Sequence, residues 1–177
     1  LGADSKATIV ESFSGDSVYW TGQTTQISLM ERAELRHYKS QADSTTAFHT
    51  ANANVKMARG SNYESFVLST GAGLSRNEIN IVLDGEGASC TLGGSYLMRQ
   101  RQHVDNTTEI IHARPLTTSK EVYKGVLDDQ SRGVFQGRIV VQPDAQKSDG
   151  HQLNKTILLS DRAEIDSKPE LEIYADD

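Results

Sequence analysis

The stretch Ile139–Ala145, IVVQPDA, decides the fold, because it joins an apolar strand to a tight corner within seven residues. Ile139 and Val141 are two positions apart, the spacing of side chains on one face of a strand. Gln142-Pro143-Asp144 contains residues that favour turns, and Ala145 would fit a corner where side-chain space is short. The stretch therefore predicts a strand, a tight corner and the start of the next strand.

The same spacing of two apolar residues and one small residue recurs along the chain. The further matches are Ile27-Leu29-Ala33, Phe66-Leu68-Ala72, Ile81-Leu83-Gly87 and Ile157-Leu159-Ala163. Several intervals are one to three times a length of about 18 to 20 residues, which is a plausible rung of a β-solenoid. A β-sandwich would also give many short strands. The very short corners and the repetition along the whole chain favour the solenoid.

Strand signals dominate the rest of the sequence. Segments rich in β-branched or aromatic residues cover 6–13, 17–29, 64–69, 77–85, 88–94, 133–142, 155–160 and 170–175. Residues 28–39 have helix propensity, but the sequence also alternates there, with Ala33, Leu35, His37 and Lys39 set against Glu34, Arg36 and Tyr38. We therefore expect two strands there, with a turn near Glu31-Arg32. The prediction is an all-β protein with almost no α-helix and one domain over residues 1–177.

The last eleven residues, SKPELEIYADD, repeat the strand pattern. Ser167–Pro169 predicts a turn, and the two-residue period after it directs Leu171, Ile173 and Ala175 toward the core. Because this strand runs almost to the last residue and the first residue is Leu1 rather than Met, we expect a piece of a longer protein.

The composition excludes several classes of protein. The net charge is -6 with acidic and basic residues interspersed, which argues against a nucleic-acid surface. No apolar run approaches the roughly 20 residues that a membrane helix needs. Cys90 is the only cysteine, so no internal disulfide can form, as in proteins of a reducing compartment. We expect a cytoplasmic protein that binds neither nucleic acid nor membranes.

Residues that often carry chemistry show no motif in this chain. The five histidines are His37, His49, His103, His112 and His151. None is spaced from another, or from Cys90, as metal ligands are, so we expect structural or surface roles. Cys90 lies among small and apolar neighbours, which predicts a buried structural thiol. Phosphate loops and G-x-S-x-G elbows are missing, so we assign no catalytic, cofactor-binding or metal residue.

Two other functional classes stay open at this point. A carbohydrate-active β-helix enzyme would need carboxylates clustered in a groove. Asp128-Asp129 and Asp176-Asp177 are acid pairs, but neighbouring residues of a strand point to opposite faces. Trp20 is the only tryptophan available as a platform for a sugar ring. The other alternative is a purely structural β-solenoid.

Four motifs between Ile111 and Asp177 suggest a family. They are YKGVL, GVFQGRI, AQKSDGHQLNKTILLS and PELEIYADD, preceded by HARPLTTSKE. This wording closely resembles the SufB/SufD family of the Suf iron–sulfur cluster assembly system, and the SufD branch more than SufB. The first hundred residues are similar to the family only in their general character, as strands rich in Gly and Ala.

The resemblance implies a right-handed parallel β-helix core, truncated before the C-terminal helical region of the family. It implies a non-catalytic scaffold that pairs with SufB and reaches the SufC ATPase through a region absent here. An Fe–S cluster or iron would be held only in the full complex, so no cofactor is expected in this fragment. Asp176-Asp177 would precede a Cys- and His-containing segment that this chain lacks. Without SufB, we expect a weak homodimer through strands near Ile157–Ala163 and Leu171–Ala175.

Overall fold

The computed structural model describes residues 1–176, and every regular element in that range is a β-strand. The strands are β1 (Lys6–Ser14), β2 (Trp20–Leu29), β3 (Glu34–Ala42), β4 (Phe48–Met57), β5 (Asn62–Ser69), β6 (Leu74–Leu83), β7 (Ser89–Met98), β8 (His103–His112), β9 (Thr118–Leu127), β10 (Arg132–Val141), β11 (Asp149–Leu158) and β12 (Glu164–Ile173). The predicted all-β class is confirmed. Within residues 1–176, no helix is long and apolar enough to cross a bilayer.

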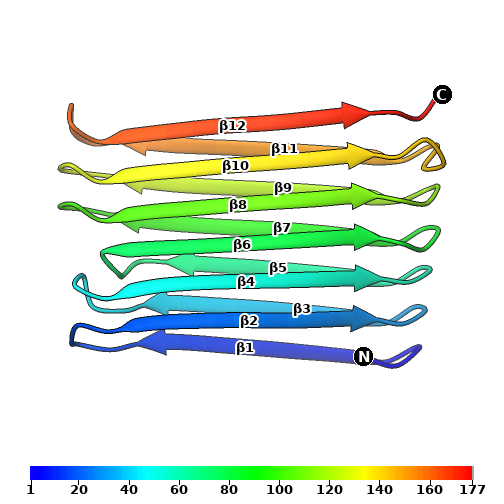
Figure 1. Cartoon of the computed structure of the whole chain (residues 1–177), viewed down its shortest axis with the longest axis horizontal. Helices are drawn as coiled ribbons and strands as arrows, with labels where there is room; N and C mark the ends of the chain where they lie inside the picture. The colour runs from blue at the N-terminus through cyan, green and yellow to red at the C-terminus, as the bar shows by residue number, and fades with distance from the viewer. Residues whose placement is uncertain (177) are drawn as a thin grey trace.

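The strands form two six-stranded parallel sheets, which face each other (Figure 1). The odd sheet has the order β1-β3-β5-β7-β9-β11, and the even sheet has the order β12-β10-β8-β6-β4-β2. In Figure 1 the odd strands run leftward behind the even strands, which run rightward, while the chain rises from β1 to β12. A coil of this sense is right-handed, so the predicted parallel β-solenoid is confirmed. Each turn contributes one strand to each sheet.

The length of a turn differs from the predicted 18–20 residues. Residues stacked in register on successive turns are 26 positions apart at Phe48 and Leu74, and 32 apart at Arg132 and Glu164. The prediction was wrong because the recurring spacing mixes two orientations. Ile81 faces the interior, where it is buried, whereas Phe66 lies on the outer surface and is 39% exposed.

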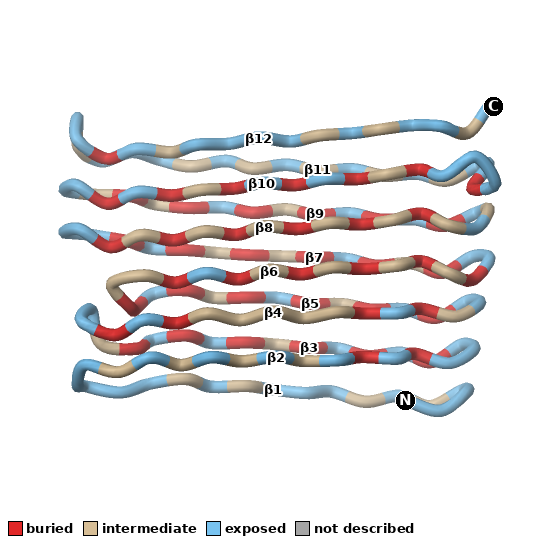
Figure 2. The backbone as a smooth tube through the Cα atoms, in the orientation of Figure 1, coloured by how far each residue is buried: buried red, intermediate tan, exposed pale blue. Residues whose placement is uncertain are grey.

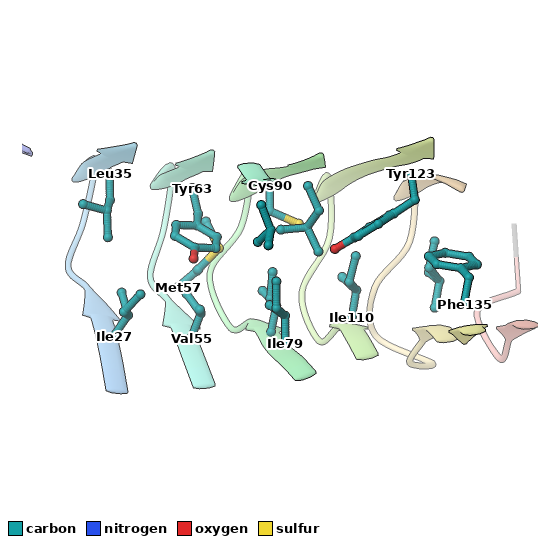
Figure 3. Close-up of a cluster of buried hydrophobic side chains, with 14 of the residues drawn as sticks. Ile27, Leu35, Val55, Met57, Tyr63, Ile79, Cys90, Ile110, Tyr123 and Phe135 are labelled. Atoms are coloured by element: carbon teal, nitrogen blue, oxygen red, sulfur yellow. The ribbon is translucent and has the colours of Figure 1, made fainter. Parts of the chain in front are cut away.

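Side chains inside the coil stack in ladders along its axis. One ladder crosses the whole even sheet through Ile27, Val55, Ile81, Ile110, Ile139 and Leu171, each in register with the next. The five residues from Ile27 to Ile139 are buried, and part of this core is visible in Figure 3. Burying an aliphatic side chain contributes about 1.5–3 kcal/mol. This ladder is therefore a principal source of the stability of the coil.

Burial falls off at both ends of the coil. Figure 2 shows buried residues alternating along the central strands, while β1, β11 and β12 are mostly exposed or intermediate. Leu171 is in register with buried Ile139 and therefore points toward the core, as predicted, yet it is 52% exposed. Ile173, in register with buried Val141, is 61% exposed. Both side chains face inward, but no further turn of the described chain covers them.

Small residues occupy the corners, as the sequence predicted. Ala33, Ala72 and Ala145 are fully buried and Ala163 nearly so. At the Ile81-Leu83-Gly87 match the residue buried at the corner is Ala88, one position later, while Gly87 has a φ of 69° that suits glycine. The predicted turn at Glu31-Arg32 is also confirmed.

Other details of the predicted strands were wrong or missing. Ser167–Pro169 was predicted as a turn but lies inside β12. Pro169 fits there because β12 is an edge strand, where the missing N–H need not pair. Strands β4, β8 and β9 had no counterpart in the list of predicted strands, since Asn and Asp residues such as those in β4 and β8 are depleted in ordinary strands.

Two tyrosines and two glycines pack reciprocally between β7 and β9. Gly94 is in register with Tyr123, and Tyr96 is in register with Gly125. Both tyrosines are buried, and a Cβ built on either glycine would overlap the ring on the neighbouring strand. The rings therefore fill the space that the glycines leave.

We predict that Gly125→Ala lowers the free energy of unfolding by about 1–3 kcal/mol, because the methyl group must displace the buried Tyr96 ring. Urea denaturation followed by circular dichroism measures the change. Gly22→Ala is the control, since Gly22 is exposed and its nearest neighbour would be 4.0 Å from the new Cβ. Equal stability of the two variants would contradict this account of the packing.

Candidate functional site

The interior of the coil is polar at its N-terminal turns. We define the interior polar cluster as Glu11, His37, Lys39, Gln41, Asp43, His49 and Asn77. All except Glu11 are buried. The alternation of β3 explains this arrangement, since His37, Lys39 and Gln41 lie on the same face as Leu35.

Lys39 is the buried cation of this cluster. Its Nζ donates a hydrogen bond to Asn77 Oδ1 at 3.1 Å and lies 5.1 Å from the centroid of the Phe13 ring. Burial lowers the pKa of Lys39 to about 8, although the nearby Glu11 and Asp43 carboxylates oppose that shift. Lys39 is therefore mostly charged at neutral pH and is held by carboxylates and by the face of an aromatic ring.

The Glu11 and Asp43 carboxylates near Lys39 accept hydrogen bonds from other side chains of the interior. Glu11 accepts hydrogen bonds from Gln23 Nε2 at 2.6 Å and lies 3.0 Å from His37 Nε2. Burial opposes ionisation of Glu11, but these hydrogen bonds and the positive charges outweigh it, so its pKa is lowered. Asp43 accepts from Tyr19 and Gln41, and the pKa of Asp43 is lowered in the same way despite burial.

His49 lies beside Asp43 with its Nδ1 3.1 Å from Asp43 Oδ2. Burial, together with the charge of Lys39, lowers the pKa of His49 to about 4. The ring is therefore neutral at pH 7, packed edge-on against Phe13. His49 Nε2 has no hydrogen-bond partner among the described residues.

The space within this cluster is small. A cavity of about 30 Å³ lies between side chains that include Glu11, His37 and Lys39. Since one water occupies roughly 10–15 Å³ on this measure, the cavity holds about two water molecules and no larger substrate. The cluster is suited to holding charge and water inside the coil.

Cys90 lies in the apolar part of the core, as the sequence predicted. It is 3% exposed, and Figure 3 shows it near Tyr123 and above Ile79 and Ile110 of the even sheet. Burial raises the pKa of the Cys90 thiol, and the nearby Glu121 adds to the shift. A thiol kept protonated and away from solvent is a poor nucleophile and a poor metal ligand.

Glu121 is a buried carboxyl group that the sequence analysis did not single out. Its Oε2 accepts a hydrogen bond from Thr108 Oγ1 at 2.7 Å, while its Oε1 has no partner in residues 1–176. Gln152 Oε1 also has no hydrogen-bond partner among these residues, while Gln152 Nε2 donates to the Glu170 carbonyl at 2.9 Å. Both unpartnered oxygens border Gly137. Because Glu121 and Gln152 are in register, a proton on Glu121 Oε1 would place a donor on the strand beside an unpartnered acceptor.

The remaining histidines are separated from one another. His112 is fully buried and lies 2.8 Å from both Thr117 Oγ1 and Ser119 Oγ, and burial lowers the pKa of His112 to about 4. His103 is half-buried at the start of β8, and His151 is exposed on β11. Among residues 1–176, no three His, Cys, Asp or Glu side chains come together as metal ligands would.

The two predicted acid pairs have different surroundings. Asp128-Asp129 was considered as part of a strand, but the pair lies in the turn after β9. There Asp128 accepts from the Asp129 amide at 2.8 Å, and Asp129 accepts from the Gln100 amide at 2.9 Å. The pair therefore shapes corners. Asp176 follows the end of β12, and Asp177 lies outside the described residues.

We predict that Cys90→Ser lowers the free energy of unfolding by about 1–2 kcal/mol, since the more polar hydroxyl would be buried among apolar side chains. The native thiol should react with iodoacetamide only after urea unfolds the protein. Thr91→Ser on the exposed face of β7 is the control and should change stability little. Alkylation of the folded protein at the rate of a free thiol would contradict the burial of Cys90.

The raised pKa of Glu121 leads to a prediction of how the free energy of unfolding depends on pH. Burial raises the pKa of Glu121 from its ordinary value of 4.5 to about 7. Between these values the unfolded chain has lost the proton that the folded protein keeps. The contribution of Glu121 to the free energy of unfolding should therefore be largest below pH 4.5. It should decrease as the pH rises and level off above pH 7. A shift of this size corresponds to about 3 kcal/mol.

Urea denaturation of Glu121→Gln from pH 5 to pH 8 measures this contribution. The variant keeps a neutral group that can donate to Gln152, so it should lose the part of the pH dependence due to Glu121 and be more stable than the parent at pH 8. Glu86→Gln in an exposed corner is the control. Parallel pH profiles for the parent and Glu121→Gln would show that Glu121 does not hold the proton.

Comparison with protein families matches residues 1–177 to the family described as "SUF system FeS cluster assembly, SufBD core domain". The chain is 29% identical to "Iron-sulfur cluster assembly protein SufD" of Escherichia coli (strain K12), in an alignment covering 100% of this chain and 42% of that protein. It is 28% identical to an "Iron-sulfur cluster assembly SufBD family protein" of Synechocystis, with coverage of 98% and 40%.

A plant protein, "Protein ABCI7, chloroplastic" of Arabidopsis thaliana, is 30% identical over 96% of this chain and 36% of its own length. The chain thus spans about two fifths of the length of these relatives. The family match covers all of the chain, including the residues of the coil and its interior polar cluster. The chain belongs to the SufBD core family of the SUF iron–sulfur cluster assembly system and is SufD-like.

Proposed function

We propose that this chain is a non-catalytic scaffold subunit of the Suf complex, which pairs with SufB and works with the SufC ATPase. The observation that carries the proposal is the last turn of the described coil. Leu171 and Ile173 point toward the core but are 52% and 61% exposed. A partner coil that extends the two sheets would bury them.

The edge strands β11 and β12 provide the backbone for such pairing. Each lies at the end of its sheet, so one row of its N–H and C=O groups faces away from the neighbouring strand. Free sheet edges bind other strands by β-augmentation. SufB, as a second member of the same family, would present strands of matching geometry.

The outer carboxylates argue against the carbohydrate-active alternative. On the even sheet, Glu109 lies 2.9 Å from Arg138, and Glu170 lies 2.7 Å from Lys168. A glycosidase needs one carboxyl group with a raised pKa and another placed across a cleft. Carboxylates paired with cations on an open sheet face lack that arrangement.

We assign no catalytic, cofactor or metal residue to this chain, and place it in the cytoplasm. The iron–sulfur cluster is then cargo of the assembled complex. The buried, protonated Cys90 supports this assignment, because its thiol is not available to carry iron or sulfur.

Sedimentation velocity of the chain mixed with its cognate SufB tests the proposal. We predict a heterodimer that Leu171→Asp weakens at least about tenfold, since a carboxylate would be buried in an apolar seam. The control is Val10→Asp, which adds the same charge at an exposed position of β1 at the other end of the coil.

The chain alone gives the baseline for this experiment. We expect weak self-association through the same edge, strengthened by salt because Glu170 and Glu172 of two copies would approach each other. Absence of a SufB complex at about 100 μM, a concentration that detects binding near -5 kcal/mol, would overturn the pairing.

A further inference from the structure

The outer face of the odd sheet carries ordered rows of side chains over its last three strands. Leu97 of β7, Val126 of β9 and Ile157 of β11 are in register and form one apolar row. Leu97 is 51% exposed and Ile157 is 60% exposed. The two outermost members of the row thus offer apolar surface to a partner.

A second row runs beside the first and contains two lysines. Lys124 and Lys155 are in register on neighbouring strands, and both are exposed. Neighbouring strands are about 4.8 Å apart, and like charges directly opposite each other are destabilising. Among the described residues, neither lysine has an ion-pair or hydrogen-bond partner. This uncompensated pair lies in a chain whose net charge is -6.

On the outer face of the even sheet, by contrast, arginines form ion pairs with carboxylates of neighbouring strands. Arg132 pairs with Asp166 on the next strand, and Arg138 lies between Glu109 and Glu172 at 2.9 and 3.1 Å. Positive charge on that face is compensated within the coil. Lys124 and Lys155 are thus free to pair with carboxylates of another molecule.

A shallow groove connects the two rows. It has a volume of about 470 Å³ and is lined on its outer side by Ser95, Lys124 and Lys155 along one edge and by Leu97, Val126 and Ile157 along the other. The groove therefore joins an apolar strip to a basic strip, both parallel to the axis of the coil.

We propose that this groove docks an acidic amphipathic helix of a partner protein, lying along the coil axis. A helix repeats its surface every 5.4 Å, close to the spacing of about 4.8 Å between strands. Apolar residues at helix positions i, i+4 and i+7 would contact the row from Leu97 to Ile157. Glu or Asp residues on the adjacent helix face would contact Lys124 and Lys155.

A protein partner fits this face better than an anionic membrane or a nucleic acid. The aliphatic side chains lie on a flat sheet beside the lysines, without the protruding tryptophan or tyrosine typical of membrane anchors. Nucleic-acid surfaces carry larger basic clusters and stacking aromatics, and this groove offers two lysines with aliphatic neighbours.

Fluorescence anisotropy with a labelled helical peptide tests the proposal. The probe is an 18-residue synthetic helix with Leu at positions i, i+4 and i+7 and Glu on the adjacent face, and a Lys-for-Glu version is its counterpart. We expect the acidic helix to bind with a Kd below about 1 mM and to weaken severalfold when salt rises from 50 to 500 mM.

Charge reversal identifies the groove as the binding site. Lys124→Glu with Lys155→Glu should weaken binding of the acidic helix at least tenfold and favour the basic helix, and Leu97→Ser should weaken both helices. Lys168→Glu, on the even sheet near the same end of the coil, is the matched control and should leave binding unchanged. Circular dichroism of each variant confirms that the strands remain.

Several outcomes would overturn the proposal. One is no binding of the acidic helix at 1 mM, and another is binding that the lysine variants leave unchanged. A third is lysine-dependent binding to vesicles with 30% phosphatidylserine in the absence of helix binding, which would assign the face to a membrane. Loss of SufB pairing through Leu171→Asp tests a different surface, so the two proposals fail independently.

Discussion

The fold depends on stacking each interior side chain on its counterpart in the turns above and below. The ladder from Ile27 to Leu171 is the clearest case, because one aliphatic side chain from each even strand contacts the next over the whole coil. In a solenoid each turn contacts mainly its neighbours. A side chain that fits poorly therefore disturbs two adjacent turns, and the end turns keep one uncovered side each.

The same constraint explains why polar residues inside the coil occur in groups. Lys39 could not be buried alone, since an isolated charge in the interior costs several kcal/mol. Carboxylates of Glu11 and Asp43 and the amide of Asn77 surround it on neighbouring strands. Among the described residues no cation pairs with Glu121, and burial raises the pKa of Glu121 to about 7, so protonation offsets the cost of its burial at and below that pH. The interior thus balances the charge of Lys39 with carboxylates, and it limits the charge of Glu121 by raising the pKa of that group.

Sequence alone predicted the class of the fold better than its dimensions. Short corners with buried alanines, such as Ala33 and Ala145, were identified because tight turns leave little side-chain space. The turn length was misjudged, since spacing in one strand does not tell an inward Ile81 from an outward Phe66. The alternation from Ala33 to Lys39 predicted a strand, but it did not reveal that Lys39 lies on the buried face beside Leu35. Its carboxylate partners come from other turns, which local patterns do not reveal.

The surfaces of the coil differ in how completely their charged side chains are paired and their apolar side chains are covered within the chain. The even face pairs Arg138 with Glu109 and Glu172 on the strands at either side, so the charge of Arg138 is compensated within the coil. The last turn exposes inward-facing Leu171, which calls for an apolar cover with strand geometry. The odd face sets Lys124 against Lys155, which calls for negative charge. The two surfaces differ in their relation to the interior ladder: Leu171 is the uncovered last member of that ladder, whereas Lys124 and Lys155 lie on the outer face and take no part in it.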